Sequence, residues 1–410
     1  MKSILFISYD GMTDPLGQSQ VIPYLAGLTR YGYRFTILSC DKPEAYTKKK
    51  DYVLGLLKGL PIEWVSIPYH KNPPILSSLY DYQKLKQKAK QLYRNQPFDM
   101  VHTRPGVPTL VALWLKNKFG IRFFNDVRGF WADERVDGGM WNTRNPLFNS
   151  IYRFFKKHEY ECLEKADGIT CLTYAAREEM LGWKNISKQP LDIEVIPCSA
   201  DLDLFNPDKI DQKLQQKFIQ QLGINASDML YSYLGSIGGW YLTKEMMRFC
   251  KKLADKNPAA KFLFISPHRH EQIRDAALQQ GLAENRLITI NAARHEVPVL
   301  LSLSRFSIFF IKSCYSKISS SPTKHGEIMA MGIPVITNSG VGDVKRISDE
   351  YNAGYVVDDF TDASFDEVIA KLQEGKPFSA ESIRAGAKAY YNLQTAVEKY
   401  ASVYSKIFGN

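Results

Sequence analysis

The chain has 410 residues, of which 45% are hydrophobic, so it is too long for one ordinary core and two domains are expected. Lys and Arg outnumber Asp and Glu by 53 to 43. The net charge of +10 fits nucleic acid, an anionic lipid surface or a phosphorylated substrate as partner, and it also fits an ordinary basic protein. Neither zinc-finger spacing nor an RNP-like aromatic stretch is present, which argues against nucleic acid.

No run of residues approaches the roughly 20 apolar residues of a membrane span. The first apolar run, 3–7, is too short for a signal peptide and is typical of a buried strand. The six cysteines are scattered, with no C-x-x-C pair, so we expect reduced thiols and no disulfide framework. We therefore expect a cytoplasmic protein, either soluble or peripheral at the inner face of the plasma membrane, with no metal site and no cofactor.

Short apolar strands alternate with helical stretches along the chain, which predicts two parallel α/β units. The first strand, 3–8, is followed by a helix from about Ser19 to Tyr31. A polar helix at about 211–221 links the units, and the last helix is expected to begin near Ser379. The other strands are expected at 35–39, 62–67, 100–102, 122–126, 168–172, 194–196, 229–235, 262–266, 287–290, 306–311, 334–337 and 354–357.

The loop after the first strand contains Gly17 and Gln18 and leads into a helix. Ligands bind at the carboxyl ends of parallel strands, and a glycine there lets the backbone approach a phosphate. The loop lacks a G-x-G-x-x-G pattern, so a dinucleotide site is not indicated. An ordinary connection explains the same residues.

A basic stretch, 84–94, alternates Lys and Arg with apolar residues at helical spacing. It fits a surface helix that packs its apolar stripe on the sheet. It fits equally well a helix that contacts anionic lipid headgroups.

A second candidate site follows the strand at 122–126. Asp126 and Arg128 lie at the strand end, where they could orient an acceptor hydroxyl and a phosphate. His102 ends the preceding strand and belongs to the same neighbourhood. An ion pair that braces the loop, with a hydrogen-bonded structural histidine, is the competing explanation.

The first strand of the second unit runs into the glycine-rich loop 235–244. Backbone N–H groups of Gly235, Ser236, Gly238 and Gly239 can bind phosphate oxygens as a nest. Lys244 lies in the following helix and could simply be solvated.

The segment 321–336 predicts a loop, a short helix and a buried strand in succession. Pro322 suits the helix entrance, and Thr323 and Lys324 lie in its first turn. Free N–H groups, the helix dipole and an ammonium group together form a receptor for phosphate. One turn further, Glu327 is a suitable acceptor for two sugar hydroxyls, as acidic residues are on nucleotide riboses. This short segment could hold both ends of a nucleotide-sugar.

This segment resembles the nucleotide-sugar motif of retaining GT-B glycosyltransferases of the family-four type. The matching residues are Glu327, Met329, Ala330, Gly332, Pro334 and Val335. The resemblance extends along nearly the whole chain. It implies an α/β fold of two Rossmann-like, doubly wound domains that face a cleft. The implied divisions are an acceptor domain at 1–205, a nucleotide-sugar domain at 206–378, and a helix at 379–410 that crosses back to the first domain.

The chain departs from the family pattern at several positions. The donor-sugar glutamate of the family is Ser319 here, and the usual arginine and lysine of the diphosphate loop are Ser236 and Tyr241. Asp126 stands roughly where many members have a histidine. We expect Lys324 to supply the missing positive charge.

The resemblance implies transfer of a sugar, with retention, from a nucleotide-diphosphate donor to a glycan or lipid-linked acceptor, in surface polysaccharide, capsule or glycolipid synthesis. It implies that Glu327 holds the ribose, that Lys324 and the 235–239 loop hold the diphosphate, and that Asp126 and Arg128 act at the reacting end. The leaving diphosphate would take the acceptor proton, with charge neutralised by protein groups instead of a metal.

Two alternatives stay open. One is a sugar-nucleotide epimerase with the same fold, against which the loss of a carboxylate at Ser319 argues mildly. The other is a non-catalytic subunit that binds a nucleotide-sugar or a lipid and assists a partner. The departures at Ser236, Tyr241 and Ser319 keep this alternative open.

Overall fold

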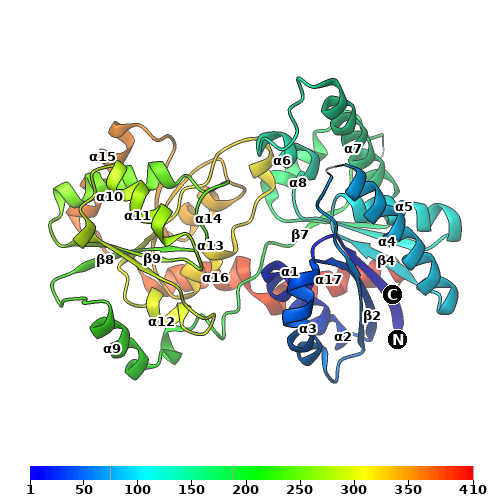
Figure 1. Ribbon diagram of the computed structural model, residues 1–410, viewed down its shortest axis with the longest axis horizontal. Helices are drawn as coiled ribbons and strands as arrows, with labels where there is room; N and C mark the ends of the chain where they lie inside the picture. The colour runs from blue at the N-terminus through cyan, green and yellow to red at the C-terminus, as the bar shows by residue number, and fades with distance from the viewer. Residues whose placement is uncertain (74, 188, 410) are drawn as a thin grey trace. The chain divides into compact units, whose positions relative to one another are not determined.

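The structure, a computed structural model, describes residues 1–73, 75–187 and 189–409. The chain forms two compact units (Figure 1). Unit 1 comprises Met1–Pro197 and Leu393–Asn410, and unit 2 comprises Cys198–Asn392. The contacts thus divide the chain at Pro197 and again at Asn392, whereas the sequence placed its divisions at residues 205 and 378. The last helical stretch is accordingly shared between the two units.

Unit 1 contains a seven-stranded parallel sheet with the order β3-β2-β1-β4-β5-β6-β7. The chain moves outward from β1 in both directions, so the strand order reverses between β1 and β4. Such a reversal opens a crevice at the carboxyl ends of the strands, where α/β sheets bind ligands. The strands are β1 (Lys2–Ser8), β2 (Tyr33–Asp41), β3 (Ile62–Pro68), β4 (Met100–Thr103), β5 (Arg122–Val127), β6 (Gly168–Cys171) and β7 (Ile193–Val195).

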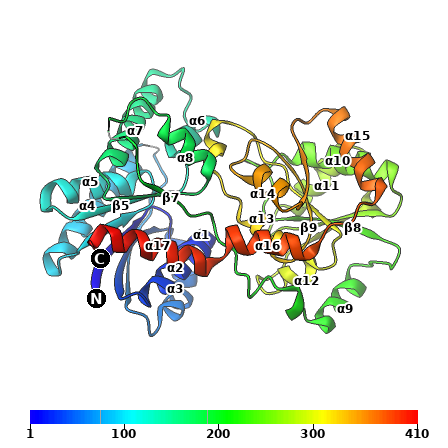
Figure 2. The ribbon, with the colours of Figure 1, turned by 180° about the vertical axis from the view of Figure 1, so that it is seen from behind.

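Helices cover both faces of this sheet (Figures 1 and 2). One layer contains α2 (Ile22–Thr29), α3 (Pro43–Leu57) and α17 (Leu393–Phe408). The other contains α4 (Leu76–Asn95), α5 (Val107–Phe119) and α7 (Pro146–Lys165). The remaining helices of the unit are α1 (Pro15–Gln20), α6 (Trp131–Asp137) and α8 (Tyr174–Leu181).

The first helical stretch differs from the expected single helix from Ser19 to Tyr31. It begins earlier because Pro15 occupies the first turn of α1, a position that tolerates a missing N–H. It breaks at Val21, whose φ and ψ of −124° and −66° are not helical.

The C-terminal helix α17 is an integral part of the unit 1 core. Val397, Tyr400 and Tyr404 are buried against α2 and the sheet. The two helices approach closely because Gly27 has no side chain: a Cβ there would lie 2.6 Å from Val397 Cγ2. The preceding helix, α16 (Ala380–Tyr391), ends at Asn392 and belongs to unit 2.

Unit 2 repeats the architecture with six parallel strands in the order β10-β9-β8-β11-β12-β13. Its reversal of strand order lies between β8 and β11. The strands are β8 (Met229–Leu234), β9 (Ala260–Ile265), β10 (Leu287–Ile290), β11 (Phe306–Ile308), β12 (Val335–Asn338) and β13 (Gly354–Val357). Strand β11 is shorter than the predicted 306–311, because its pairing with β8 and β12 covers only its first residues.

The helices of unit 2 also form two layers. One contains α10 (Thr243–Lys256), α11 (His270–Gln279) and α15 (Asp362–Glu374). The others are α9 (Gln212–Gln221), α12 (Val297–Leu301), α13 (Thr323–Ala330), α14 (Val344–Glu350) and α16, of which α13 and α16 pack together. No helix in the described ranges is long and apolar enough to cross a membrane.

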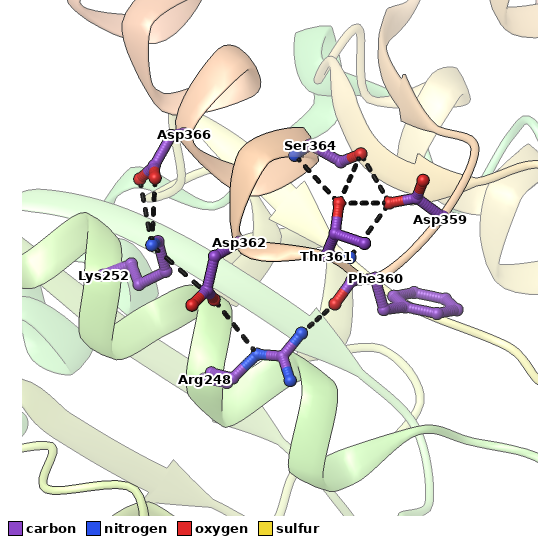
Figure 3. Close-up of polar contacts among 8 residues, drawn as sticks. All are labelled: Arg248, Lys252, Asp359, Phe360, Thr361, Asp362, Ser364 and Asp366. Atoms are coloured by element: carbon purple, nitrogen blue, oxygen red, sulfur yellow. Dashed lines mark hydrogen bonds and ion pairs between the residues drawn. The ribbon is translucent and has the colours of Figure 1, made fainter.

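The junction of α10 and α15 shows how charge fixes a helix start (Figure 3). Thr361 caps α15 by accepting a hydrogen bond from the Ser364 N–H at 3.3 Å. Lys252 on α10 lies 3.6 Å from Asp362 and 3.1 Å from Asp366 in the first turns of α15. The lysine thereby holds the start of α15 against α10 on the outer layer of the sheet.

Candidate functional site

The start of α13 lies beside the strand reversal of unit 2, as the predicted site requires. A Cβ on Gly235, the residue after β8, would lie 3.0 Å from Lys324 Nζ in the first turn of α13. Gly235 has a φ of +114°, a conformation in which only glycine is unstrained. The structure therefore brings the predicted diphosphate loop and the predicted helix start into direct contact.

Lys324 is buried, and no described carboxylate forms an ion pair with it. Its side chain hydrogen-bonds the Tyr233 hydroxyl at 3.4 Å, and its Nζ lies 4.5 Å and 3.8 Å from the ring centroids of Tyr233 and Tyr241. It forms no ion pair within the described part of the chain. Burial lowers the pKa of Lys324 to about 7, against the opposing charge of Glu327. A buried lysine that is held by two tyrosines and has no ion-pair partner among the described residues is suited to bind an anion.

The contact with Tyr241 bears on a departure noted in the sequence. The family pattern led us to expect a lysine at position 241, and the residue there is a tyrosine whose ring contacts the ammonium of Lys324. The positive charge is thus present at the same edge of the sheet but is carried by α13. The position of Lys324 beside Tyr241 agrees with the expectation that Lys324 supplies the positive charge that position 241 lacks.

Glu327 lies one turn further along α13 and is 5% exposed. Its Oε1 accepts a hydrogen bond from Arg294 Nη2 at 2.6 Å. A carboxylate can accept about four hydrogen bonds. Glu327 can therefore still accept hydrogen bonds from hydroxyl groups while it is paired with Arg294.

Tight packing holds α13 in place. A Cβ on Gly326 would lie 2.6 Å from Cγ of Tyr391 in α16, so the glycine before Glu327 lets the two helices meet. His325 is buried, and its Nδ1 hydrogen-bonds the Tyr391 hydroxyl at 2.9 Å. Burial lowers the pKa of His325 to about 3, so this histidine is neutral and structural. Packing against α16 therefore fixes the orientation of α13, and with it the positions of Lys324 and Glu327.

The other predicted donor-binding residues lie around the same edge. Gly238 and Gly239 have φ values of +77° and +62°, and the carbonyl of Ser236 accepts a hydrogen bond from the Tyr233 hydroxyl. Ser319 is buried, and its hydroxyl donates to the Ser316 carbonyl at 2.7 Å. Thr323 is the first residue of α13.

Two arginines at this edge escaped the sequence analysis. Arg294 follows β10, and Arg269 follows β9 with a φ of +64°, unusual for a residue other than glycine. Arg269 Nη1 donates to the Ile237 carbonyl at 3.3 Å, inside the glycine-rich loop. Both arginines could have been found from the sequence, because each lies in a loop that follows a predicted strand. Such loops converge at one edge of a parallel sheet.

In unit 1 the structure brings His102, Asp126 and Arg128 together and buries the first two. Asp126 Oδ1 accepts hydrogen bonds from Thr170 at 2.9 Å and from Tyr400 of α17 at 3.0 Å. Burial alone would raise the pKa of Asp126, but Arg128, His102 and Arg104 hold it well below its usual range. Asp126 is therefore an ionised carboxylate inside a hydrogen-bonded network.

The same network includes His102 and Arg128. His102 Nδ1 hydrogen-bonds the Tyr404 hydroxyl at 2.6 Å, and burial lowers the pKa of this histidine. Arg128 donates to the Tyr400 hydroxyl at 3.3 Å and to Gln20 Oε1 at 3.2 Å. The contacts show that these side chains anchor α17 to β4 and β5.

The cavity beside Asp126 has a volume of about 10 Å³, close to the space of one water molecule. This cavity is too small for a sugar ring. A catalytic role for His102, Asp126 and Arg128 stays a prediction, whereas their structural role is visible in the contacts.

The loop after β1 is also firmly held. Gly17 lies in α1, where a Cβ would come within 2.5 Å of the Gly11 carbonyl oxygen, and Gln18 Nε2 donates to the Thr13 carbonyl at 3.1 Å. The Thr13 backbone and hydroxyl both donate to Asp41 Oδ1 at the end of β2. The glycine thus serves a close backbone contact, and a ligand contact for Gly17 and Gln18 stays a prediction.

No group of three or more His, Cys, Asp or Glu side chains that could hold a metal ion occurs among the described residues. All six cysteines are free, and five of them are buried. Reduced thiols without a disulfide framework stay a prediction.

Two family profiles match most of the chain. The profile described as glycosyl transferases group 1 matches residues 215–389, and that of glycosyltransferase family 4 matches residues 18–204. The chain belongs to the GT-B glycosyltransferases of the family-four type. Enzymes of this family transfer a sugar from a nucleotide-sugar donor. No curated protein sequence matches the chain significantly.

Solved structures share the fold of this chain at low sequence identity. Sucrose-phosphate synthase from Thermosynechococcus elongatus aligns over 100% of both chains, with 13% identity and a TM-score of 0.72. HepE from Anabaena, solved in complex with UDP, covers 99% of this chain and 100% of its own, with 16% identity and a TM-score of 0.71. WaaG, a glycosyltransferase involved in lipopolysaccharide biosynthesis, covers 98% of this chain and 99% of its own, with 14% identity and a TM-score of 0.66. The predicted fold of two Rossmann-like, doubly wound units is confirmed.

Proposed function

We propose that this glycosyltransferase binds its nucleotide-sugar in unit 2, with the ribose on Glu327 and the diphosphate on Lys324 and the loop 235–239. The observation that carries the proposal is the buried, unpaired Lys324 in contact with Gly235. A bound diphosphate supplies the negative charge that this ammonium lacks. Ribose hydroxyls on Glu327 would lie one helical turn away, on the same α13.

The base is proposed to be uracil, because the similar structure of HepE holds UDP. The test is calorimetric titration of UDP, GDP, ADP and CMP into the wild type and Glu327→Ala. We expect UDP to bind best and to lose most of its affinity in the variant. Equal binding by both proteins, or binding by neither, would reject the donor site.

We propose that transfer proceeds with retention and without a metal. Lys324 and the N–H groups of the loop 235–239 would neutralise the leaving diphosphate, and that diphosphate would take the acceptor proton. The anomeric configuration of the product, read by NMR, tests retention. Turnover that persists in EDTA tests metal independence, and activity that stops and returns with Mg²⁺ contradicts it.

The acceptor is proposed to be a glycan or lipid-linked sugar of surface polysaccharide, capsule or glycolipid synthesis, bound by unit 1 at the cytoplasmic face of a membrane. The similar protein WaaG acts in lipopolysaccharide biosynthesis. On α4, Leu85 and Ala89 pack inward as the structural reading predicted, while Lys84 and Arg94 face solvent. Leu76, Leu79 and Tyr80 at the start of α4 are also exposed.

Apolar residues beside cations suit an interface with anionic lipid. The only acidic residue of α4, Asp81, is buried and paired with His70 at 2.6 Å. The outer face of α4 therefore presents no negative charge to a bilayer. Binding of the protein to vesicles that contain anionic lipid tests this contact.

A further inference from the structure

A groove lies between two helices in one outer layer of unit 1. The helices α4, α5 and α7 cover the same face of the sheet, and the groove opens between α5 and α7 (Figures 1 and 2). Its volume is about 420 Å³, which lies in the range of sites for small ligands. Besides two leucines of α5, the groove is lined by Trp114, Asn117, Lys118, Phe154, His158 and Glu161.

This groove is remote from the strand ends at which the candidate sites lie. Helix α5 follows the carboxyl end of β4 and runs back toward the start of β5, so its second half, with Trp114 and Asn117, lies toward the opposite edge of the sheet. Helix α7 likewise runs back toward the start of β6, and Glu161 lies in its last part. The groove is therefore separate from the network around Asp126.

Two aromatic side chains line the groove, one from each helix. Phe154 is 55% exposed although it is apolar, and its ring stacks on the ring of His158 with 5° between the planes. Trp114 is held by its neighbours: Lys86 of α4 lies 4.8 Å from its ring centroid, and Phe119 contacts it edge to face. Both rings are therefore held in place before a ligand binds.

Polar groups lie beside these rings. The Asn117 amide and Glu161 Oε2 form no hydrogen bond with the residues that the structure describes, whereas Glu161 Oε1 accepts one from Lys165 at 2.6 Å. Lys118 adds an ammonium group. Burial lowers the pKa of His158 to about 4, so its imidazole is neutral. The groove thus offers an amide, a carboxylate oxygen and an ammonium to a ligand.

The chemistry of these groups separates the possible occupants. A phospholipid headgroup would place its phosphate beside the carboxylate of Glu161, which repels it. A helix that docks through an apolar stripe would bury the Asn117 amide and the Lys118 ammonium without partners. A sugar ring has an apolar face for an aromatic side chain, and its hydroxyl groups both donate and accept hydrogen bonds. A saccharide therefore satisfies all of these groups together.

We propose that the groove between α5 and α7 is a second carbohydrate site of this glycosyltransferase and that it binds an uncharged saccharide. Trp114 and Phe154 pack on the sugar, and Asn117 and Glu161 bind its hydroxyl groups. The site goes beyond the proposed donor and acceptor sites and does not depend on either. A glycan long enough to reach both this groove and the strand ends of unit 1 would be held at two points, which raises its effective concentration.

Saturation-transfer NMR tests the site with glucose, galactose, mannose, rhamnose, N-acetylglucosamine and maltotriose, and with glucuronic acid and glycerol 3-phosphate as charged probes. The main variant is Phe154→Ala, because this exposed side chain can be removed without opening the core. Glu161→Gln is the second variant. Tyr52→Ala is the matched control, because Tyr52 is a 60% exposed aromatic residue on α3, in the other helical layer. Thermal melting of each variant confirms that it is folded.

We expect at least one neutral sugar to bind the wild type more tightly than either charged probe does. Phe154→Ala should weaken that sugar by about three- to tenfold, the range for the loss of one aromatic contact. Glu161→Gln, which keeps an acceptor oxygen, should weaken it less, and Tyr52→Ala should match the wild type. Glu327→Ala should bind the sugar as the wild type does, because the groove is separate from the proposed donor site.

Four results would overturn the inference. They are the absence of binding by every neutral sugar, equal binding by Phe154→Ala and the wild type, tighter binding of glycerol 3-phosphate than of any neutral sugar, and a wild-type dimer that Phe154→Ala dissociates in sedimentation. The third result would indicate a lipid headgroup, and the fourth a second copy of the chain. A sugar signal that is lost in Glu327→Ala and kept in Phe154→Ala would belong to the donor site, so only this inference would fall.

Discussion

The two units share one architecture, yet their strand-end loops hold charge in different ways. In unit 1, Asp126 is buried among groups that pair with it, including Tyr400 of α17. In unit 2, Lys324 is buried with no negative partner among the described residues. Paired buried charges hold a fold together, whereas an unpaired one costs stability unless a ligand completes it. The comparison separates a structural polar network in unit 1 from the proposed binding site in unit 2.

The surfaces of the units differ as well. Unit 1 contains 30 Lys and Arg against 21 Asp and Glu, whereas unit 2 contains 23 against 22, so unit 1 carries nearly all of the net charge. Among the described residues, 12 of the 14 exposed large hydrophobic side chains also belong to unit 1. Charge and apolar surface together support our proposal that unit 1 binds the acceptor or an anionic bilayer.

The largest expected effect comes from breaking the paired network of unit 1. Asp126→Ala leaves Thr170 and Tyr400 without their shared hydrogen-bond acceptor and removes the negative charge beside His102 and Arg128. We expect a loss of about 3–5 kcal/mol in the free energy of unfolding. Denaturant unfolding measures this loss. Asp126→Asn, which keeps one acceptor oxygen, should lose less. Unchanged stability with abolished turnover would instead place Asp126 in the chemistry.

Removing the charge of Lys324 should have the opposite effect to Asp126→Ala: it should lower activity and leave stability intact. We expect Lys324→Met to lower kcat/KM for the donor by about 10²–10³-fold, the usual scale for losing one charge-stabilising group. The free energy of unfolding should stay the same or rise, because a buried ammonium is removed. Lys244→Met, on the exposed face of α10, serves as the control. A large loss of stability in Lys324→Met would show that the lysine is structural.

Binding to vesicles that contain phosphatidylglycerol tests the difference in surface charge between the two units. Replacing Lys84 and Arg94 of α4 by Gln should weaken vesicle binding by about 2 kcal/mol, at about 1 kcal/mol for each cation. The matched control replaces Lys213 and Lys217 of α9 by Gln, which removes the same charge from unit 2. Equal weakening by both pairs would mean that net charge, and not the α4 face, determines binding.

Lys324 should also make the stability of the protein depend on pH. The pKa of Lys324 is about 7 in the folded protein, below the value of about 10.4 in an unfolded chain. The unfolded chain therefore binds the extra proton between these values, so this residue makes stability rise as the pH increases from 7 toward 10. A melting series should show this slope in the wild type and a smaller one in Lys324→Met.

The affinity for the donor should depend on pH in the opposite direction to the stability. A diphosphate favours the charged form of Lys324, so a nucleotide-sugar should take up a proton when it binds at pH 8 and should bind more weakly as the pH rises further. Calorimetry in two buffers of different ionisation enthalpy measures the uptake. No uptake at pH 8 would contradict contact between Lys324 and the diphosphate.

Much of this protein followed from local sequence alone. The alternation of apolar strands with helices predicted two parallel α/β units, and the segment around Glu327 predicted a short helix with Lys324 in its first turn. These features depend on neighbouring residues in the chain, through strand hydrophobicity, a proline at the helix entrance and a glycine at its end. The candidate donor residues were found for the same reason.

Other features were decided by tertiary contacts. Asp126 lies at a strand end, as expected, but its partner Tyr400 is contributed by a helix 274 residues further along the chain. Arg294 meets Glu327 across 33 residues, and Tyr241 meets Lys324 across 83 residues. Whether a polar side chain is paired depends on which distant segments the fold brings to it, and burial then sets the cost of leaving it unpaired. Local sequence contains the groups, whereas the folded chain decides which of them are left for a ligand.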